Sequence, residues 1–272
     1  MLDQTYQNLE VIVVDDCSTD NTKSVLERIQ DPRLRYIRLK KNSGACTARN
    51  RGINEAKGDF IAFQDSDDEW SRDKIELQIK RLLESGADFC FCRMKTTDTQ
   101  NGIQGYIPDD ETEKNLTYER LLIGNYISTQ MLLIKKECLE HIRFDESMPR
   151  YQDWDLVLSL TKKYKMVYEP KTLVNQYIQC DSISRSNLKL AKATQQILIK
   201  YEKDFLTHKA AYIKMLKDVS RNMTINNMDA IYYYKKLFSV NKSLKSALKI
   251  VLYKLHILQL YYKIKFKKSS GR

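Results

Sequence analysis

Residues 9–16 read Leu-Glu-Val-Ile-Val-Val-Asp-Asp, and residues 59–70 read Asp-Phe-Ile-Ala-Phe-Gln-Asp-Ser-Asp-Asp-Glu-Trp. The first stretch contains a short β-branched run, which predicts a strand over 9–14 that is buried on both faces, as in a parallel sheet. The second predicts another strand over 59–63. Acids follow each run at once, so two strands of the predicted sheet end in carboxylates.

The rest of the chain continues this alternation. Strand-like and helix-like segments follow one another, which is the pattern of an α/β fold with a mostly parallel sheet flanked by helices. Further strands are expected over 34–39, 88–94, 128–134 and 166–178, and helices over about 20–29, 43–56, 72–84 and 153–164. Polar residues 97–116 predict a mobile loop. From about 187 the pattern is helical, so we expect one domain over 1–185 and a helical C-terminal region over 186–272.

The composition argues against several classes of protein. Hydrophobic residues make up 42% of the chain and aromatic residues 10%, which is typical of a folded protein. The six cysteines form no C-x2-C pair and there are only three histidines, so we expect no zinc site. The cysteines are interpreted as small core residues in a reducing compartment.

The net charge of +11 is concentrated near the end of the chain. Residues 230–272 hold 11 Lys and Arg and no Asp or Glu, which leaves 35 basic and 35 acidic residues in 1–229. A surface that binds nucleic acid more often spreads its charge over the folded body. The charge pattern therefore favours a protein that does not bind nucleic acid, with binding through the tail as the alternative.

The acidic clusters predict a metal site. Ligands of open α/β sheets bind beyond the carboxyl ends of the strands, where Asp15-Asp16 and Asp65-Ser66-Asp67-Asp68 are expected to lie. Gathered carboxylates repel each other, and a hard cation such as Mg²⁺ or Mn²⁺ relieves that repulsion. The cation would also neutralise a diphosphate and improve it as a leaving group. In the alternative interpretation these acids only form turns or cap helices.

Three segments resemble motifs of family 2 glycosyltransferases, which have the GT-A fold. Val13–Asp20 is similar to the family's VDDxSxD segment, Ala48–Gly52 resembles its ARNxG helix, and Phe63–Trp70 resembles its D-x-D-D-x-W segment. The motifs occur in the family's order, and the resemblance covers about residues 1–180. It implies a GT-A, Rossmann-like domain over 1–185 that takes a sugar from a nucleotide-sugar donor, most often a UDP-sugar.

The resemblance also implies a role for individual residues. Asp16 would hydrogen-bond the nucleobase, with Asp15 in support, and Arg49 would reach the nucleotide. Asp65 would bind the ribose or the metal through water, and Asp67 would ligate Mn²⁺ or Mg²⁺. An ion pair on a helix surface is the alternative for Arg49.

An inverting transfer needs a carboxylate that takes the proton of the acceptor hydroxyl. The family places this base in an acidic pair well after its D-x-D motif, and Tyr151–Leu156 occupies the matching place here. We assign Asp153 as the base. Asp155 is the competitor, and a cap of the helix over 153–164 is the structural alternative for Asp153.

The chain departs from the family's pattern at its start. The strand and most of the helix that usually precede the segment at Gln4–Glu10 are missing, which predicts an open strand edge. A truncated form, a misassigned start or a degraded copy would each account for this. The second functional hypothesis is therefore a catalytically impaired remnant that binds a partner or a membrane. The family's Q-x-x-R-W motif is absent too, which favours transfer of a single sugar.

The basic tail predicts an amphipathic helix. Apolar residues from Leu244 to Tyr262 recur at helical spacing, with lysines beside and after them. Such a helix suits an anionic membrane surface, contacted through residues 242–268; packing of the same helix on the body is the alternative. The acceptor would be a saccharide or a lipid-linked saccharide. We see neither a signal peptide nor an apolar run of membrane-spanning length, and expect a cytoplasmic protein, peripheral on the inner face of the cell membrane.

Overall fold

The computed structural model describes residues 1–110, 116–178 and 187–269. The chain forms two compact units. The first comprises Met1–Tyr118, Asn125–Ser147 and Gln152–Cys180, and the second comprises Glu119–Gly124, Met148–Tyr151 and Asp181–Arg272. The boundary expected at residue 185, and residues 111–115 of the expected loop, lie outside the described residues.

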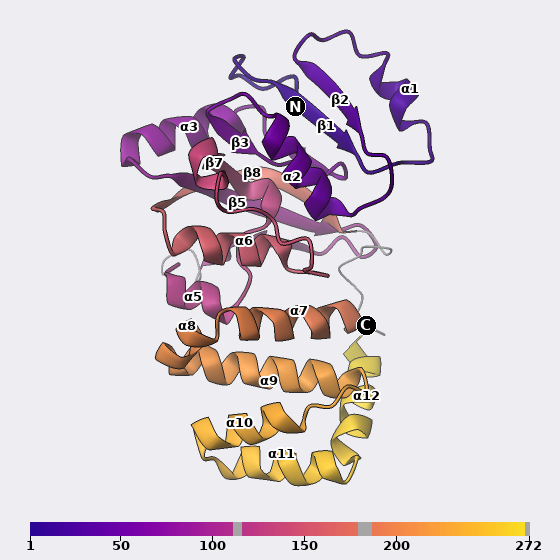
Figure 1. The fold of residues 1–272 in the computed structure, drawn as a ribbon, viewed down its shortest axis with the longest axis vertical. Coiled ribbons are helices and arrows are strands. Elements are labelled where there is room, and N and C mark those ends of the chain that lie inside the picture. Colours follow the sequence, from indigo (N-terminus) through magenta and orange to yellow (C-terminus); the bar gives the residue numbers. More distant parts are fainter. Residues whose placement is uncertain (111–115, 179–186, 270–272) are drawn as a thin grey trace. The chain divides into compact units, whose positions relative to one another are not determined.

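The first unit begins with a small parallel sheet. In it β1 (Val11–Asp15) pairs with β2 (Leu34–Arg38). The short helix α1 (Thr22–Leu26) connects these strands, and α2 (Ala45–Glu55) packs against β1 (Figure 1). Among the described residues no strand pairs with the other edge of β1. Its three central residues are only half-buried, so the predicted burial on both faces is wrong, because the open edge leaves them accessible.

The second sheet has six strands and mixed directions. Its order is β3-β7-β5-β8-β4, with β6 beside β5. The strands are β3 (Phe60–Ala62), β4 (Asp68–Trp70), β5 (Phe89–Asp98), β6 (Gln104–Ile107), β7 (Leu132–Lys135) and β8 (Met166–Ile178). Only β5 and β8 run parallel, and the other pairs are antiparallel. The predicted α/β class is confirmed, but the sheet is not mostly parallel, because an apolar run does not encode the direction in which β7 or β4 enters.

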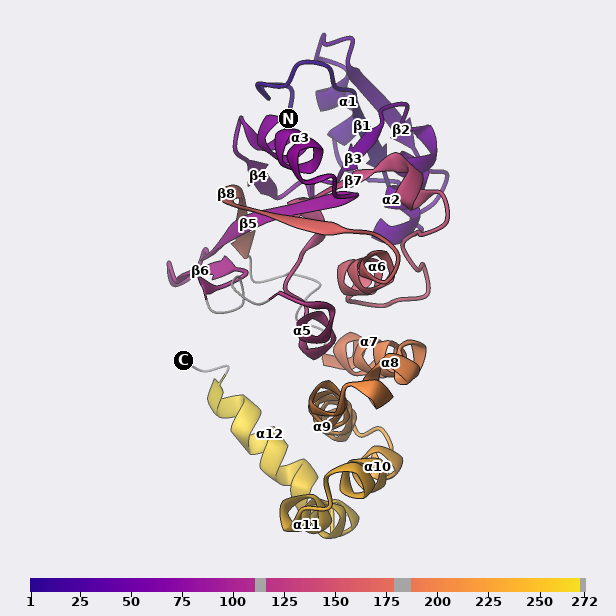
Figure 2. The ribbon, with the colours of Figure 1, turned by 90° about the vertical axis from the view of Figure 1, so that its left-hand side faces the viewer.

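Two helices cover this sheet. The helices α3 (Lys74–Ser85) and α6 (Gln152–Thr161) lie on opposite sides of β5 and β8 (Figure 2). Ile75 and Leu82 of α3 pack on Cys90 and Leu133 of the sheet. The short helices η1 (Thr129–Met131) and η2 (Lys136–Leu139) directly precede and follow β7.

The cysteines behave largely as predicted. Those that are buried as free thiols are Cys46, Cys90, Cys92 and Cys138. Burial is the main cause that raises their pKa values, to about 12 for Cys90 and about 11 for the other three. Cys17 is half-buried, and Cys180 lies outside the described residues.

The second unit consists of helices, as expected for the C-terminal region. They are α7 (Asn187–Lys200), α8 (Glu202–Thr207), α9 (Lys209–Ile225), α10 (Ile231–Asn241), α11 (Leu244–Lys254) and α12 (Ile257–Ser269), together with nearly all of the short helix α5 (Tyr118–Ile123). Tyr234 is fully buried, and its hydroxyl lies 3.0 Å from Oγ1 of Thr224, which joins α10 to α9. None of the described helices combines the length and apolarity needed to cross a bilayer.

The single helix predicted over 244–262 is wrong. The helix is interrupted at Leu255 and His256, where His256 has a φ of 58°. In α11 the hydroxyl of Tyr253 accepts a hydrogen bond from the backbone N–H of Ala230 at 2.9 Å, which holds one face of the helix on the unit. The predicted apolar stripe is divided: Leu244, Leu248, Val251 and Leu255 are exposed, whereas Leu258 and Tyr262 of α12 are buried.

Candidate active site

The carboxylate of Asp15 is tied into the end of β1. Its Oδ1 accepts a hydrogen bond from the backbone N–H of Ser18 at 2.7 Å, and its Oδ2 accepts one from the Tyr36 hydroxyl. The hydrogen bonds from Ser18, and then that from Tyr36, lower the pKa of Asp15. Asp15 is 6% exposed, so its side chain stabilises the end of the strand.

Asp16 joins β1 to the start of α2. Its two carboxylate oxygens accept hydrogen bonds from the backbone N–H groups of Ser43 and Gly44, each at 2.7 Å. These N–H groups lie at a helix N-terminus, where an anion is stabilised. Gly44 has a φ of 91°, a conformation that favours glycine. Each oxygen keeps a second lone pair, so Asp16 can still accept a bond from a nucleobase.

Two of the predicted site residues meet in an ion pair. Arg49 projects from α2, and its Nη2 lies 2.5 Å from Oδ1 of Asp65, which follows β3. The guanidinium of Arg49 also lies over the ring of Phe144, 5.4 Å from its centre. Asn50 fixes this arrangement, because its side-chain amide bonds both the N–H and the carbonyl of Phe144 at 3.0 and 2.9 Å. Arg49 is therefore held in a defined place and is not a loose surface cation.

The turn after β3 crowds three carboxylates. Asp67 is exposed, whereas Asp65 and Asp68 are half-buried. The pKa of Asp68 is raised to about 6, chiefly by burial and then by the negative charges of Asp67 and Asp65. Its Oδ2 accepts a hydrogen bond from Gln130 at 2.6 Å, while its buried Oδ1 has no hydrogen-bond partner among the described residues. This mutual repulsion is what a bound cation would relieve.

The carboxylates of the turn fit a metal ion that is completed by ligands from the substrate. No three His, Cys, Asp or Glu side chains of the described residues are arranged as a ready ligand group. Mg²⁺ does not require one, since it is usually held by one or two carboxylates together with substrate phosphates and water. Asp65 and Asp67 supply hard oxygen donors of this kind. They suit a divalent cation that arrives with a diphosphate.

Asp153 lies at the start of α6 and belongs to the same electrostatic neighbourhood. Its Oδ1 accepts the backbone N–H of Trp154 at 2.8 Å. Desolvation of this carboxyl by the surrounding protein raises its pKa. Hydrogen bonds from the Asn125 amide and the Trp154 N–H, and the charge of Arg49, offset part of that increase. Asp65 raises the pKa further. Arg49 and Asp65 thus act on Asp153, although more than 85 residues of sequence separate them from it.

The competitor for the catalytic base is buried. Asp155 is 1% exposed, whereas Asp153 is still partly accessible to solvent. A base must come within hydrogen-bond reach of the proton that it takes. The burial of Asp155 therefore argues against it as the base and leaves Asp153 as the candidate.

The sequence analysis did not identify a set of buried polar residues in α3 and η1 that support the acidic turn. Lys74 is fully buried in α3, with its ammonium 2.6 Å from Oε1 of Gln78 and 4.1 Å from the centre of the Trp70 ring. The amide of Gln78 donates to the carbonyl of Met131 at 2.9 Å. Met131 follows Gln130, which holds Asp68. A Lys at the start of a helix normally points to solvent, and single amides carry no pattern, so none of these residues stood out.

Solved structures with the same fold were found by comparison. The structure of Staphylococcus aureus TarS in complex with UDP-GlcNAc aligns over 99% of this chain and 86% of that one, with a TM-score of 0.69 and 15% identity. The mannosyltransferase PcManGT of Pyrobaculum calidifontis, in complex with GDP-Man and Mn²⁺, aligns over 96% and 78%, with a TM-score of 0.60 and 18% identity. These similarities show that the chain has the GT-A-type fold of such transferases.

Curated relatives are closer in sequence. TuaG of Bacillus subtilis strain 168, named for teichuronic acid biosynthesis, is 34% identical over 200 residues, which cover 71% of this chain and 77% of TuaG. The Escherichia coli UDP-Glc:alpha-D-GlcNAc-diphosphoundecaprenol beta-1,3-glucosyltransferase WfgD is 30% identical over 162 residues, or 60% and 62% of the two chains. The family model described as Glycosyl transferase family 2 matches residues 1–142. With this match and the relatedness to TuaG, the chain belongs to glycosyl transferase family 2.

Proposed function

We propose that this protein is an inverting glycosyltransferase that moves a single sugar from a nucleotide-diphosphate sugar, by default a UDP-sugar, to a hydroxyl group. The observation that carries the proposal is the common neighbourhood of Arg49, Asp65 and Asp153. They come from α2, from the turn after β3 and from α6. Such a displacement requires a positively charged side chain, a carboxylate that can bind a metal and a general base, and these three residues can supply them.

The donor would be bound from the side of β1 and α2. Asp16 accepts hydrogen bonds from the nucleobase, with Asp15 holding the strand end. Arg49 exchanges Asp65 for a phosphate oxygen, as a guanidinium binds either kind of anion through parallel hydrogen bonds. Mn²⁺ or Mg²⁺ held by Asp67 and Asp65 would neutralise the diphosphate leaving group.

Asp153 would act on the acceptor. The acceptor oxygen attacks the anomeric carbon as the bond to the nucleoside diphosphate breaks, and Asp153 takes the hydroxyl proton. One in-line displacement inverts the configuration at that carbon. The raised pKa of Asp153 supports this role, because a more basic carboxylate takes a proton more readily near neutral pH.

We further propose that the acceptor is a saccharide or lipid-linked saccharide used in cell-surface polysaccharide or glycolipid synthesis. The names of TuaG and WfgD support this, since they refer to teichuronic acid biosynthesis and to a diphosphoundecaprenol-linked sugar. The exposed apolar side chains of α11 and α12 support a peripheral position on an anionic membrane, on its cytoplasmic face. The neutral charge balance of residues 1–229 argues against a nucleic-acid partner.

A second candidate function is a catalytically impaired relative that binds a partner or a membrane. The observation that favours it is the unpaired edge of β1, because Asp15 and Asp16 at its end are then supported on one side only among the described residues. Calorimetry with UDP and Mn²⁺ separates the two functions. Binding that needs the metal supports the enzyme, and no binding of UDP or GDP supports the impaired relative.

The test of the catalytic proposal is Asp153→Asn. We expect metal-dependent UDP binding within about threefold of the wild type but transfer slower by about 10²–10⁴-fold, the usual contribution of a general base. Asp59→Asn, an exposed acid beside β3, is the matched control and should keep both properties. Transfer by Asp153→Asn at the wild-type rate would refute the assignment of the base.

A further inference from the structure

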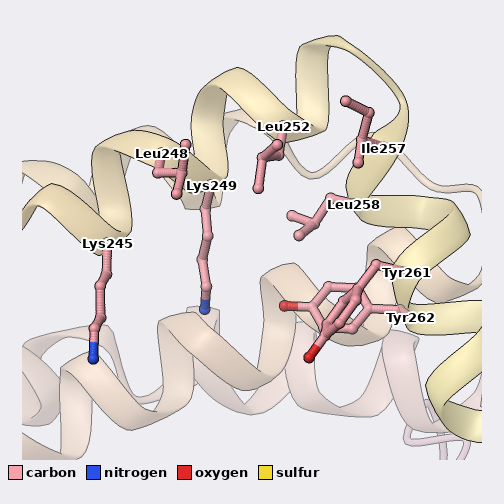
Figure 3. Close-up of a pocket in the computed structure, with 8 residues that line it drawn as sticks. All are labelled: Lys245, Leu248, Lys249, Leu252, Ile257, Leu258, Tyr261 and Tyr262. Carbon is pink, nitrogen blue, oxygen red and sulfur yellow. The ribbon is translucent and has the colours of Figure 1, made fainter.

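A cavity of about 330 Å³ lies between α11 and α12. Leu248 and Leu252 of α11 face Ile257 and Leu258 of α12 across it (Figure 3). The turn at His256 folds the two helices together and so creates the cavity. Because these leucine and isoleucine side chains line it, the walls of the cavity are almost entirely apolar.

Polar groups gather on one side of this cavity. The ammonium groups of Lys245 and Lys249, one helical turn apart on α11, point to the same side as the hydroxyls of Tyr261 and Tyr262 (Figure 3). Ammonium groups can donate hydrogen bonds to an anion, whereas the hydroxyl of the buried Tyr262 is already hydrogen-bonded to that of Tyr234. The cavity thus combines an apolar interior with a set of donors at one edge.

The charges that act on Lys249 are positive. Burial lowers its pKa first, and the positive charges of Lys217 and Arg221 on α9 lower it further. Asp218, the acid of that helix turn, already pairs with Lys214 and Arg221. Positive charges that crowd each other in this way favour the binding of an anion.

The face of α11 beside the cavity is apolar. Leu244, Leu248, Val251 and Leu255 follow one another at helical spacing along α11, and they are exposed by 89%, 55%, 52% and 60%. Large apolar side chains exposed on one helix face mark a surface that meets another body. An apolar surface flanked by basic residues has the composition of a helix pair that lies in the interface of an anionic bilayer.

We propose that this cavity binds one anionic phospholipid of the bilayer, with the phosphate at Lys245 and Lys249 and the first carbons of its chains between α11 and α12. The inference rests on the membrane association proposed above and names its site. Free phosphate would leave the apolar walls and the exposed leucines in water. A bilayer lipid covers both the cavity and the surface around it.

The test is co-sedimentation of the full chain with vesicles of phosphatidylcholine, alone or mixed with phosphatidylglycerol. In the pocket variant, Lys245→Gln/Lys249→Gln, binding to the mixed vesicles should fall about 30-fold, since each lysine at an anionic surface contributes about 1 kcal/mol. The control variant, Lys235→Gln/Lys254→Gln, removes two exposed lysines outside the cavity, so its loss should be several-fold smaller. Equal losses in the two variants would refute the lipid site.

Further outcomes separate this inference from the proposals on which it rests. If the wild type binds neither kind of vesicle, membrane association itself is wrong; the same holds if Leu244→Asn/Val251→Asn binds as the wild type does. Displacement from vesicles by inorganic phosphate would indicate a free-phosphate site, and a dimer that protects Leu248 from solvent would indicate a second copy; either overturns the inference. Metal-dependent UDP binding should be the same in all of these variants.

Discussion

Replacing Lys74 by Met should remove a pH dependence of stability that the wild type shows. Lys74 is fully buried, and its pKa is lowered to about 8 from 10.5, chiefly by burial. Below pH 8 the ammonium is charged in both the folded and unfolded chains, so folding carries the whole desolvation cost. Between about pH 8 and 10.5 the folded chain has released the proton and the unfolded chain has not, so stability rises with pH.

The two pKa values set the size of the effect. Their difference corresponds to about 3.4 kcal/mol of unfolding free energy, of which about 2.5 kcal/mol is recovered between about pH 7 and pH 10. Lys74→Met has no such proton. The variant leaves Oε1 of Gln78 without its donor, at a cost of about 1–3 kcal/mol. This cost does not depend on pH, so the difference between the two curves isolates the lysine.

The assay is urea unfolding followed by tryptophan fluorescence. Trp70 and Trp154, the only two tryptophans, both lie in the first unit and report on it. Lys80→Met, at a mostly exposed position of the same helix, is the control and should follow the wild type at every pH. The free energy of unfolding of Lys74→Met, minus that of the wild type, should fall by about 2.5 kcal/mol from about pH 7 to pH 10. Parallel curves would show that the ammonium is not desolvated and would refute the reasoning.

Three other predictions concern the site and the thiols. Arg49→Lys should weaken nucleotide-sugar binding about 10–100-fold, since the charge stays but the parallel hydrogen bonds to phosphate are lost, as calorimetry will measure. Asp67→Asn should weaken UDP binding about tenfold or more in Mn²⁺ and leave metal-free binding unchanged; a loss without metal would contradict its role as a ligand. In a Cys180→Ser background only Cys17 should react rapidly with a thiol reagent at neutral pH, because the other four thiols are buried with raised pKa values. Fast labelling of a second thiol would contradict that burial.

The sequence predicted those parts of the site that depend on local chemistry. An acid that directly follows a short apolar strand lies at the end of that strand in any arrangement of the sheet. Asp16 accordingly follows β1 directly, and Asp65 lies three residues after the end of β3. The start of α2 near Gly44 was likewise readable, because few other residues adopt its backbone conformation.

Features that depend on distant parts of the chain were not readable. The direction of β7 is fixed by its pairing with β3 and β5, not by its own residues. The break at His256 depends on α12 folding back onto α11, and a continuous apolar spacing hid it. The ion pair of Arg49 with Asp65 joins two motifs, and no sequence pattern indicated that they would meet.

The positioning residues show why motifs alone cannot describe this site. Asp68 needs an amide donor, and Gln130 supplies it from a position 62 residues later; Asp153 has its own amide donor in Asn125. A lone Gln or Asn in a connection has no periodicity, charge or spacing that distinguishes it from a surface residue. The buried Lys74 adds a cost to folding and, through Gln78 and Met131, supports the segment that carries Gln130. A cost of this kind is tolerated where it fixes the place of a functional group, and the group that it would fix here is the acidic turn to which we assign donor binding.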